Sequence, residues 1–234
     1  MKTTIQDKAK LVNSVFSKVY KKYDLMNDIM SLGVHRIWKN KLIDWMNPQI
    51  NQNLIDVASG TGDIAKLFSK KNNHLNHVSC IEPNNEMYLV GKSNLTNFKN
   101  IKWFKAKAEK IPFKSGSYDF YTISYGIRNV SNINLTLKEA FRVLKPGGRF
   151  MCLEFSKINN EMINLLYQQY SKAIPLIGKF VVGSTKPYDY LIKSIDEFYS
   201  QDELVRLMKN NGFSNIEYRN LSNGISAIHS GWKI

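Results

Sequence analysis

Apolar residues recur at helical spacing over the first fifth of the chain. On repeating faces of the segment 11–46 stand Leu11, Val15, Val19, Leu25, Ile29 and Leu32. The segment contains no proline, and the first one in the chain is Pro48. A period of three to four residues without a helix breaker predicts helices. We therefore expect an N-terminal helical extension over residues 1–50, able to fold over a neighbouring site as a lid.

After residue 50, short apolar runs separated by amphipathic stretches replace the helical period. The runs typical of strands are LIDVA (54–58), HVSCIE (77–82), IKWF (101–104), YDFYTIS (118–124), GRFMCLEF (148–155), NIEYRNL (215–221) and GISAIHSGW (224–232). Helical patterns fill most of the gaps between the first, second, fourth and fifth, and such alternation favours a parallel sheet covered on both faces. We therefore predict one α/β domain over residues 51–234.

Two further stretches follow the fifth predicted strand. Residues 157–197 form an aromatic-rich insertion, in which apolar side chains recur at helix-like spacing, and we expect it on the substrate side. Residues 201–213 then predict a helix with Gly212 as its C-cap. No internal repeat and no low-complexity linker is visible.

The composition and charge of the chain bear on where the protein acts more than on what it does. The chain has 234 residues and a formal net charge of +14, which fits anionic lipid headgroups, nucleic acid, or a compositional bias toward Lys and Asn. No apolar run approaches the roughly 18 residues of a membrane span, and no secretory signal is visible. Cys80 and Cys152 lie within apolar runs, so both are expected as buried, reduced thiols. We expect a cytoplasmic protein, and peripheral attachment at the inner face of the membrane is compatible with its charge.

The first predicted strand leads into a glycine turn of the kind that binds nucleotides. Gly60, Gly62 and Ala65 fit the pattern G-x-G-x-x-A, and Glu82 ends the next strand about 20 residues later. The pattern is shared by NAD-dependent oxidoreductases and by enzymes that bind S-adenosylmethionine. By itself it does not discriminate between them.

Acidic residues beside the turn favour S-adenosylmethionine. Asp56 stands in the strand before the turn, and Asp63 at the start of the following helix would repel a diphosphate there. S-adenosylmethionine has no phosphate and carries an ammonium and a sulfonium. Glu82 offers two acceptor oxygens to its ribose hydroxyls. The alternative is that Asp63 simply caps the helix.

The ends of the next strands complete the predicted cofactor pocket, because ligands of such sheets bind at the carboxyl ends of the strands. Ala108 and Glu109 follow the third strand and are placed for the adenine, while Ser124 closes the fourth. For Glu109 a solvated loop charge is the alternative. The histidines show no ligand spacing with cysteine or acid, so no metal site is predicted.

Two longer motifs make the chain resemble the ubiquinone and menaquinone biosynthesis C-methyltransferase family. YDLMNDIMSLGVHRIW (23–38) is similar to its N-terminal signature and RVLKPGGRFMCLEFS (142–156) to its second signature. The resemblance covers nearly the whole chain. It implies the three-layer, Rossmann-like class I methyltransferase fold, with a mostly parallel seven-stranded sheet, and S-adenosylmethionine as cofactor.

The family's cofactor contacts carry over residue by residue. They fall on Thr61, Glu82, Lys107, Ala108 and Ser124. Three positions depart from the family's usual residues. Lys107 stands where members commonly have Asp or Asn, so only the backbone contact with the cofactor is expected there. Glu82 replaces a more frequent Asp, and Ser59 replaces a common Gly.

The resemblance also implies the reaction, methylation of a ring carbon of a reduced, polyprenylated quinol. Arg128 and Asn129, just past the fourth strand, are expected to face the substrate, where the guanidinium could stabilise phenolate charge. The alternative for Arg128 is a bond to a structural carboxylate such as Asp24. Asp24 and His35 are the candidates for a general base, although a lone His on a helix more often packs or caps.

Further substrate contacts are expected from Tyr23, in the extension, and Tyr188, in the insertion. The insertion also carries a run proposed either as a prenyl groove or as core or dimer contact: Tyr167, Tyr170, Ile174, Leu176, Ile177 and Phe180. A homodimer or a quinone-synthesis assembly is compatible with this pattern.

Three other functions compete with quinol methylation. A nucleic-acid methyltransferase fits the charge, but ISYGIRN (123–129) lacks the Asn-Pro-Pro-aromatic motif of adenine methylation, and no cysteine is placed to attack a pyrimidine. A non-catalytic subunit would not require the glycine turn and Arg128. An oxidoreductase is disfavoured by Asp56 and Asp63. The sequence does not separate 2-polyprenyl-6-methoxy-1,4-benzoquinol from demethylmenaquinol as substrate.

Overall fold

A computed structural model describes residues 12, 17, 23–31, 33–158, 160–182 and 185–234 of the chain. Among these residues, the strands form one seven-stranded sheet in the order β3-β2-β1-β4-β5-β7-β6. The strands are β1 (Leu54–Val57), β2 (Val78–Ile81), β3 (Ile101–Phe104), β4 (Tyr118–Ser124), β5 (Leu144–Phe155), β6 (Ser214–Leu221) and β7 (Ser226–Trp232). β7 runs antiparallel to both of its neighbours, and the other pairings are parallel. The predicted mostly parallel sheet is confirmed.

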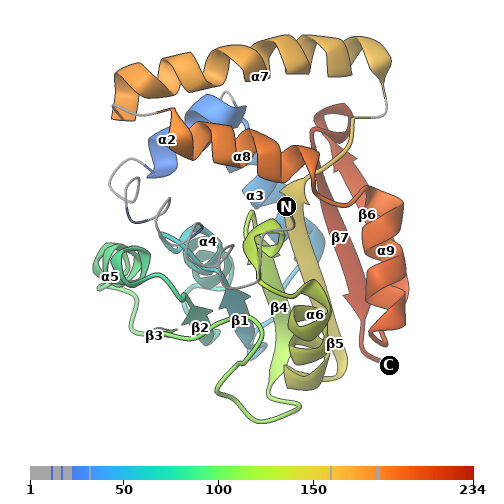
Figure 1. Cartoon of the computed structure of the whole chain (residues 1–234). Coiled ribbons are helices and arrows are strands. Elements are labelled where there is room, and N and C mark those ends of the chain that lie inside the picture. Colours follow the sequence, from blue (N-terminus) through green and yellow to red (C-terminus); the bar gives the residue numbers. More distant parts are fainter. Residues whose placement is uncertain (1–11, 13–16, 18–22, 32, 159, 183–184) are drawn as a thin grey trace.

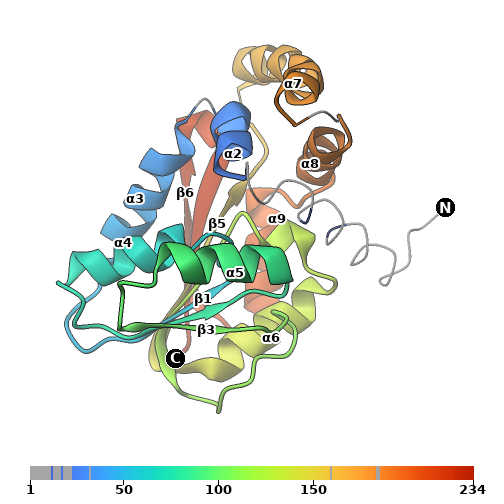
Figure 2. The ribbon, with the colours of Figure 1, turned by 90° about the vertical axis from the view of Figure 1, so that its left-hand side faces the viewer.

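Helices cover both faces of this sheet. They are α2 (Tyr23–Ser31), α3 (His35–Met46), α4 (Asp63–Lys71), α5 (Asn85–Asn94), α6 (Ile133–Val143), α7 (Glu161–Val182), α8 (Lys186–Asp196) and α9 (Gln201–Asn210), with the short 3-10 helices η2 (Ile127–Asn129) and η3 (Ser222–Gly224). Figure 2 shows α3, α4 and α5 on one face and α6 and α9 on the other. The result is the three-layer α/β architecture expected from the alternating pattern.

Each face of the sheet has its own hydrophobic core, because successive side chains of a strand point to opposite faces. Leu54 of β1 packs in a cluster with Trp38 and Phe68, whereas the next residue, Ile55, packs with Leu137 on the other face. All four residues of β1 are buried. This two-sided burial explains why the central strands are continuous apolar runs instead of alternating ones.

The described part of the N-terminal extension consists of α2 and α3. The chain turns between them at Gly33, whose φ of +77° is a conformation that favours glycine. α3 packs against the sheet through an apolar face that includes Trp38, which meets Phe155 of β5 edge to face with ring centroids 6.2 Å apart. The predicted helical pattern is therefore broken into two helices, and α3 belongs to the core of the domain.

A helical layer lies over the carboxyl ends of the parallel strands. The aromatic-rich insertion forms α7 and α8, and Figure 1 shows α7 across the top of the molecule, with α2 and α8 beneath it. α7 contacts both α2 and α8, and α8 contacts η2. The extension and the insertion, which are far apart in sequence, thus enclose the same end of the sheet.

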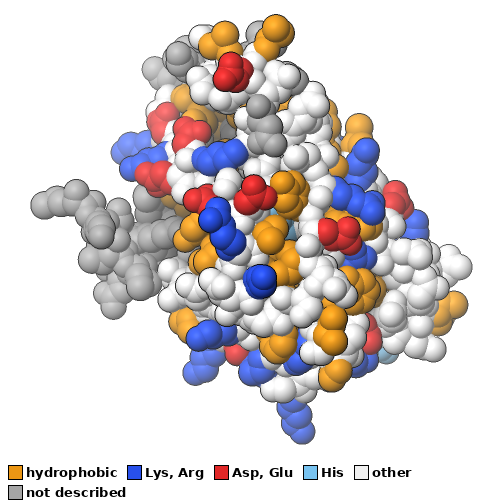
Figure 3. Space-filling model, turned by 90° about the vertical axis from the view of Figure 1, so that its right-hand side faces the viewer, with side chains coloured by type: hydrophobic (Ala, Val, Ile, Leu, Met, Phe, Trp, Pro, Cys, Tyr) orange, Lys and Arg blue, Asp and Glu red, His pale blue; other side chains and the backbone are white. Residues whose placement is uncertain are grey.

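The structure also bears on the predictions made for the cysteines, the end of α9 and the surface charge. Cys80 and Cys152 are free and buried, as predicted. Helix α9 ends one residue earlier than expected: Asn211 is its C-cap, and Gly212 follows with φ of +95°. No helix in the described residues is long and apolar enough to cross a membrane. On the face shown in Figure 3, basic side chains are interspersed with acidic ones, in line with their scatter along the sequence.

Candidate active site

Glycines let the turns after β1 and β4 pack closely against neighbouring side chains. Gly62 has φ of +91°, and a Cβ atom there would stand 2.6 Å from Cδ1 of Leu95. A Cβ atom on Gly126, in the turn after β4, would stand 2.6 Å from Cβ of Ala58. The turns after β1 and β4 therefore lie in contact, at the strand ends where the cofactor pocket is predicted.

Glu82, directly after β2, is bonded to this turn. Its Oε2 accepts a hydrogen bond from the backbone N–H of Gly60 at 2.9 Å, and its Oε1 accepts one from the N–H of Asn84 at 2.9 Å. The side chain is buried, and this burial raises its pKa to about 7. Each carboxylate oxygen has a second lone pair, so the bonds seen here leave room for ribose hydroxyls. The ribose contact stays a prediction.

Two buried polar groups beside the turn have no hydrogen-bond partner among the described residues. Asp56 of β1 accepts a hydrogen bond at Oδ1 from the hydroxyl of Thr122, 2.7 Å away, but its Oδ2 has no partner among the described residues. Burial raises the pKa of Asp56 to about 7. The hydroxyl of Ser124, at the end of β4, is also buried without a described partner. Because buried polar groups are nearly always hydrogen-bonded, both atoms are suited to a ligand.

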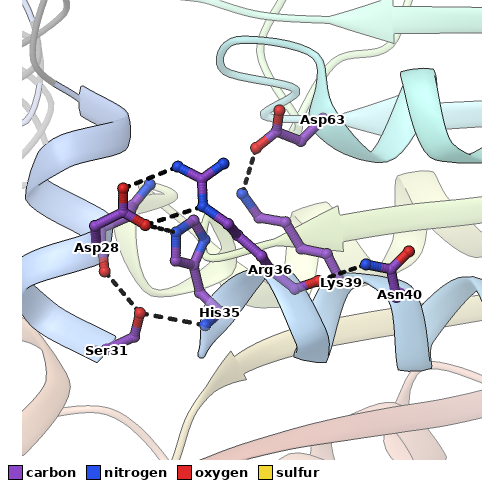
Figure 4. Close-up of polar contacts among 8 residues, drawn as sticks. Asp28, Ser31, His35, Arg36, Lys39, Asn40 and Asp63 are labelled. Atoms are coloured by element: carbon purple, nitrogen blue, oxygen red, sulfur yellow. Dashed lines mark hydrogen bonds and ion pairs between the residues drawn. The ribbon is translucent and has the colours of Figure 1, made fainter. Parts of the chain in front are cut away.

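Asp63 is not the helix cap that one sequence interpretation supposed. Gly62 is the N-cap of α4, and Asp63 is the first residue of the helix. Its Oδ2 instead accepts from Nζ of Lys39 in α3, 2.6 Å away (Figure 4). Because Lys39 neutralises this carboxylate, the electrostatic argument against a diphosphate is weaker than the sequence suggested.

The loop after β3 places its residues in different environments. The side chain of Lys107 is exposed, whereas Ala108 is buried. Glu109 is not a solvated loop charge: its Oε1 accepts the backbone N–H groups of Ser131 and Asn132, at 2.6 and 3.1 Å. The carboxylate thus fixes the loop that leads into α6. Contacts between these residues and the adenine ring remain predictions.

Arg128 in η2 is paired with a structural carboxylate, Glu154, whereas the side chain of Asp24, the example that the sequence offered, lies outside the described residues. Its Nη1 contacts Oε1 of Glu154 in β5 and donates to the carbonyl of Tyr125 at 3.0 Å. The guanidinium also lies over the ring of Phe155, 5.5 Å from its centroid. Both charged side chains are almost fully buried, and this burial raises the pKa of Glu154. The pair holds one positive group rigidly at the end of β4.

Tyrosines from the insertion surround this region. Nδ2 of Asn129 lies 3.5 Å from the carbonyl of Tyr125, and its Oδ1 accepts a hydrogen bond of 2.8 Å from the hydroxyl of Tyr190 in α8. The hydroxyls of Tyr167 and Tyr188 are buried and have no partner among the described residues. Burial raises the pKa of Tyr167 to about 12, and the nearby Arg128 opposes that shift. These hydroxyls provide donors and acceptors near η2.

The proposed prenyl run divides in the structure. Ile174 is buried in the core, and the hydroxyl of Tyr170 donates to the backbone carbonyl of Ile29 in α2. The side chains of Leu176, Ile177 and Phe180 lie outside the described residues. Ile174 and Tyr170 therefore make core contacts, and a prenyl groove stays a prediction.

His35 begins α3 and lies in a polar network. Its Nε2 is 2.9 Å from Oδ1 of Asp28, and Arg36 binds both oxygens of the same carboxylate (Figure 4). Desolvation lowers the pKa of His35, which favours the neutral ring. With the proton on Nε2, Nδ1 is left as a buried acceptor without a described partner. Asp24, the other candidate base, and Tyr23 lie in the first turn of α2, but their side chains fall outside the described part.

The structure thus joins Glu82 after β2 to the glycine turn after β1, and Asp56 of β1 to Thr122 of β4. It also adds contacts that sequence reasoning missed, made by Lys39, Glu154 and Tyr190. Lys39 directly follows the first signature and Glu154 lies within the second. The signatures therefore pointed to both positions but did not indicate what either side chain contacts. In the described residues, no group of three or more His, Cys, Asp or Glu side chains could hold a metal ion.

Comparisons with known proteins agree with this geometry. The model of the ubiE/COQ5 methyltransferase family matches residues 2–233. "Ubiquinone/menaquinone biosynthesis C-methyltransferase UbiE" of Rickettsia bellii (strain OSU 85-389) is 50% identical, covering 100% of this chain and 96% of the relative. The protein of the same name from Rickettsia prowazekii (strain Madrid E) is 49% identical, covering 96% of this chain and 93% of the relative.

Solved structures support the fold alone, because their sequences are distant. A SAM-dependent methyltransferase from Thermotoga maritima, described as a possible histamine N-methyltransferase, matches with a TM-score of 0.69 at 20% identity, covering 95% of this chain and 100% of that one. A SAM-dependent methyltransferase from Aquifex aeolicus matches with a TM-score of 0.63 at 18% identity, covering 84% and 89%. With a family match along almost its entire length, the chain belongs to the ubiE/COQ5 methyltransferase family: it is a methyltransferase, and S-adenosylmethionine is its cofactor.

Proposed function

We propose that the protein methylates a ring carbon of a polyprenylated quinol in ubiquinone or menaquinone biosynthesis. The observation that carries this proposal is the similarity, along the whole chain and at about half identity, to proteins named for this reaction. The substrate is 2-polyprenyl-6-methoxy-1,4-benzoquinol, demethylmenaquinol, or both. Both present a reduced ring with a prenyl tail.

The cofactor side of the site fits S-adenosylmethionine. Glu82 faces the glycine turn with spare acceptor capacity, and Asp56 and Ser124 bring buried polar atoms that have no described partner. Thr61 and Ala108, both buried, complete the contacts implied by the family resemblance. When bound, S-adenosylmethionine supplies an electrophilic methyl group on a sulfonium.

On the substrate side, the protein's task is to orient the ring and to manage a proton. A quinol carbon next to a ring oxygen becomes nucleophilic as that hydroxyl loses its proton. The Arg128 guanidinium, fixed by Glu154, stabilises the negative charge that develops on the oxygen. Asn129 and the tyrosine hydroxyls near η2 orient the ring, and His35 provides a neutral acceptor nitrogen.

The location we propose is the cytoplasmic surface of the membrane, where a prenyl tail would be embedded. Exposed apolar side chains occur on the helical layer over the site, namely Met162 and Leu165 of α7 and Leu25 of α2. The net charge of +14 supports attraction to anionic lipid, at about 1 kcal/mol for each suitably placed Lys or Arg. Homodimerisation and membership of a quinone-synthesis assembly remain predictions.

The test is transfer of a labelled methyl group from S-adenosylmethionine to each quinol, with bulk RNA as a parallel acceptor. Each quinone is offered with and without a chemical reductant. We expect label on a quinol only when it is reduced, and its identity assigns the branch. Label on RNA, or cofactor binding without transfer to any acceptor, would refute quinol methylation.

A matched pair of variants separates chemistry from folding. Arg128→Lys keeps a positive charge beside Glu154 but loses the planar fork, so we expect transfer to fall while S-adenosylhomocysteine binding is retained. Arg206→Lys makes the same change in an exposed arginine of α9, whose Nε donates to the carbonyl of Asp202 in the same helix. This control is expected to transfer methyl groups like the parent chain.

A further inference from the structure

Lys39 is a buried cation placed at the glycine turn by a helix outside the nucleotide-binding motif. Its side chain is 8% exposed, and its Nζ lies 2.6 Å from Oδ2 of Asp63, the residue that follows Gly62. The charge of Lys39 also lowers the pKa of Asp56, against the stronger effect of burial. The ammonium therefore lies at the carboxylate of Asp63, directly after the glycine turn (Figure 4).

The hydrogen-bonding capacity of this ammonium is mostly unused. A lysine ammonium has three N–H donors. Within the described residues, Asp63 is the hydrogen-bond partner found for Nζ. Since buried polar groups are nearly always satisfied, a buried ammonium with two donors to spare is suited to accept a further anionic partner.

The opposite charges nearby indicate what that partner is. Asp63 is 41% exposed and opens toward solvent, whereas Oδ2 of Asp56 is buried without a described partner. Lys39 and the carboxylates thus present one cation beside anions, a pattern complementary to the α-amino-acid end of S-adenosylmethionine. The ammonium of that end suits the buried Oδ2 of Asp56, and its carboxylate suits the spare donors of Lys39.

We infer that Lys39 binds the carboxylate of the methionyl end of S-adenosylmethionine, and that α3 of the N-terminal extension is thereby part of the cofactor site. The inference rests on the proposed function, because it takes S-adenosylmethionine as the ligand. It assigns a cofactor contact to a helix that precedes β1, and it links cofactor binding to the position of the extension.

The experiment compares ligands that differ only at the carboxylate. Calorimetry on the full chain measures binding of S-adenosylmethionine and of decarboxylated S-adenosylmethionine, which keeps the sulfonium and the amine. We expect the parent chain to bind the decarboxylated ligand about 10- to 100-fold more weakly, the range of a charge-assisted hydrogen bond. In Lys39→Met the two ligands should bind within about threefold of each other, because the group that distinguishes them is gone.

The control is Lys71→Met. Lys71 of α4 pairs with Asp44 of α3 at 2.8 Å, so this variant also breaks an ion pair between the same two helices, but an exposed one. It should keep the parent's preference for the carboxylate. Lys39→Met leaves only the partly exposed Asp63 without its partner, so we expect it to fold, and a thermal melt checks this.

Each outcome bears on the inference. A parent chain that does not distinguish the two ligands overturns it, as does a Lys39→Met variant that weakens both ligands equally, the result of a purely structural role. Failure of the parent to bind either ligand would overturn the cofactor assignment as well. Quinol methylation is judged separately by label transfer, so a chain that methylates quinol without using Lys39 refutes this inference alone.

Discussion

The buried pair Arg128–Glu154 allows a quantitative prediction, because its two members differ in how they can respond to the loss of the other. Glu154→Gln keeps the shape of the side chain and removes the negative charge that Nη1 of Arg128 contacts in a buried site. An arginine cannot shed its proton in a protein, so the charge stays. Breaking a buried pair in this way costs about 3–5 kcal/mol of unfolding free energy.

Arg128→Met leaves a carboxylate, which can escape the penalty by taking up a proton. The ordinary pKa of this group is 4.5, and burial already raises it in the parent chain. Neutralising it therefore costs about 1.4 kcal/mol for each pH unit above 4.5, which is about 0.7 kcal/mol at pH 5 and about 3.4 kcal/mol at pH 7. The folded variant binds more protons than the unfolded chain in this window, so its stability falls as pH rises.

The assay is urea unfolding of the cofactor-free chain, followed by circular dichroism at pH 5, 6 and 7. At pH 5 we expect Glu154→Gln to be less stable than Arg128→Met by about 2–4 kcal/mol, and at pH 7 the two should be nearly equal. The double variant carries neither charge, so its loss should be smaller than the sum of the single losses.

Two results would refute this reasoning. One is a gap between the single variants that stays constant from pH 5 to pH 7, because it would mean that Glu154 does not take up a proton. The other is a double variant whose loss equals the sum of the single ones, because the two side chains would then not be coupled.

Three further predictions concern the turn and the substrate side. Asp56→Asn removes a carboxylate whose pKa burial raises from 3.8 to about 7, so the folded parent loses stability as pH rises through that window. In urea melts, the unfolding free energy of the variant should match that of the parent near pH 4 and exceed it increasingly toward pH 7. A difference independent of pH would contradict this. Gly62→Ala and Gly147→Ala both place a side chain at positive φ, at a cost above about 1 kcal/mol of stability, but only the new Cβ at position 62 meets another atom within 4 Å. Calorimetry should therefore show loss of S-adenosylhomocysteine binding in Gly62→Ala alone. Equal binding by the two variants would count against the packing argument. Tyr190→Phe loses a hydrogen bond to Asn129, beside η2, worth about 0.5–1.5 kcal/mol. Steady-state kinetics should show a raised KM for the quinol alone. A matching rise in the KM for S-adenosylmethionine would refute a role limited to the substrate side.

Local patterns in the sequence were enough to locate the strands and most helices. Strand LIDVA appears as β1 and the glycine turn follows it, because period, glycine spacing and turn chemistry depend on neighbouring residues. The same locality explains the errors. The break at Gly33 and the end of α9 at Asn210 depend on single backbone angles, which the hydrophobic period does not encode.

The sequence by itself determined the class of fold, the glycine turn and, through two signatures, the family. Only the tertiary structure decided which charges meet. Arg128 pairs with Glu154 because β4 and β5 are neighbours whose carboxyl ends align, and Lys39 reaches Asp63 because α3 packs beside α4. Such partners lie 24 to 26 residues apart along the chain. Their contact depends on strand order and helix packing, which arise from burial of the whole core and not from any local pattern.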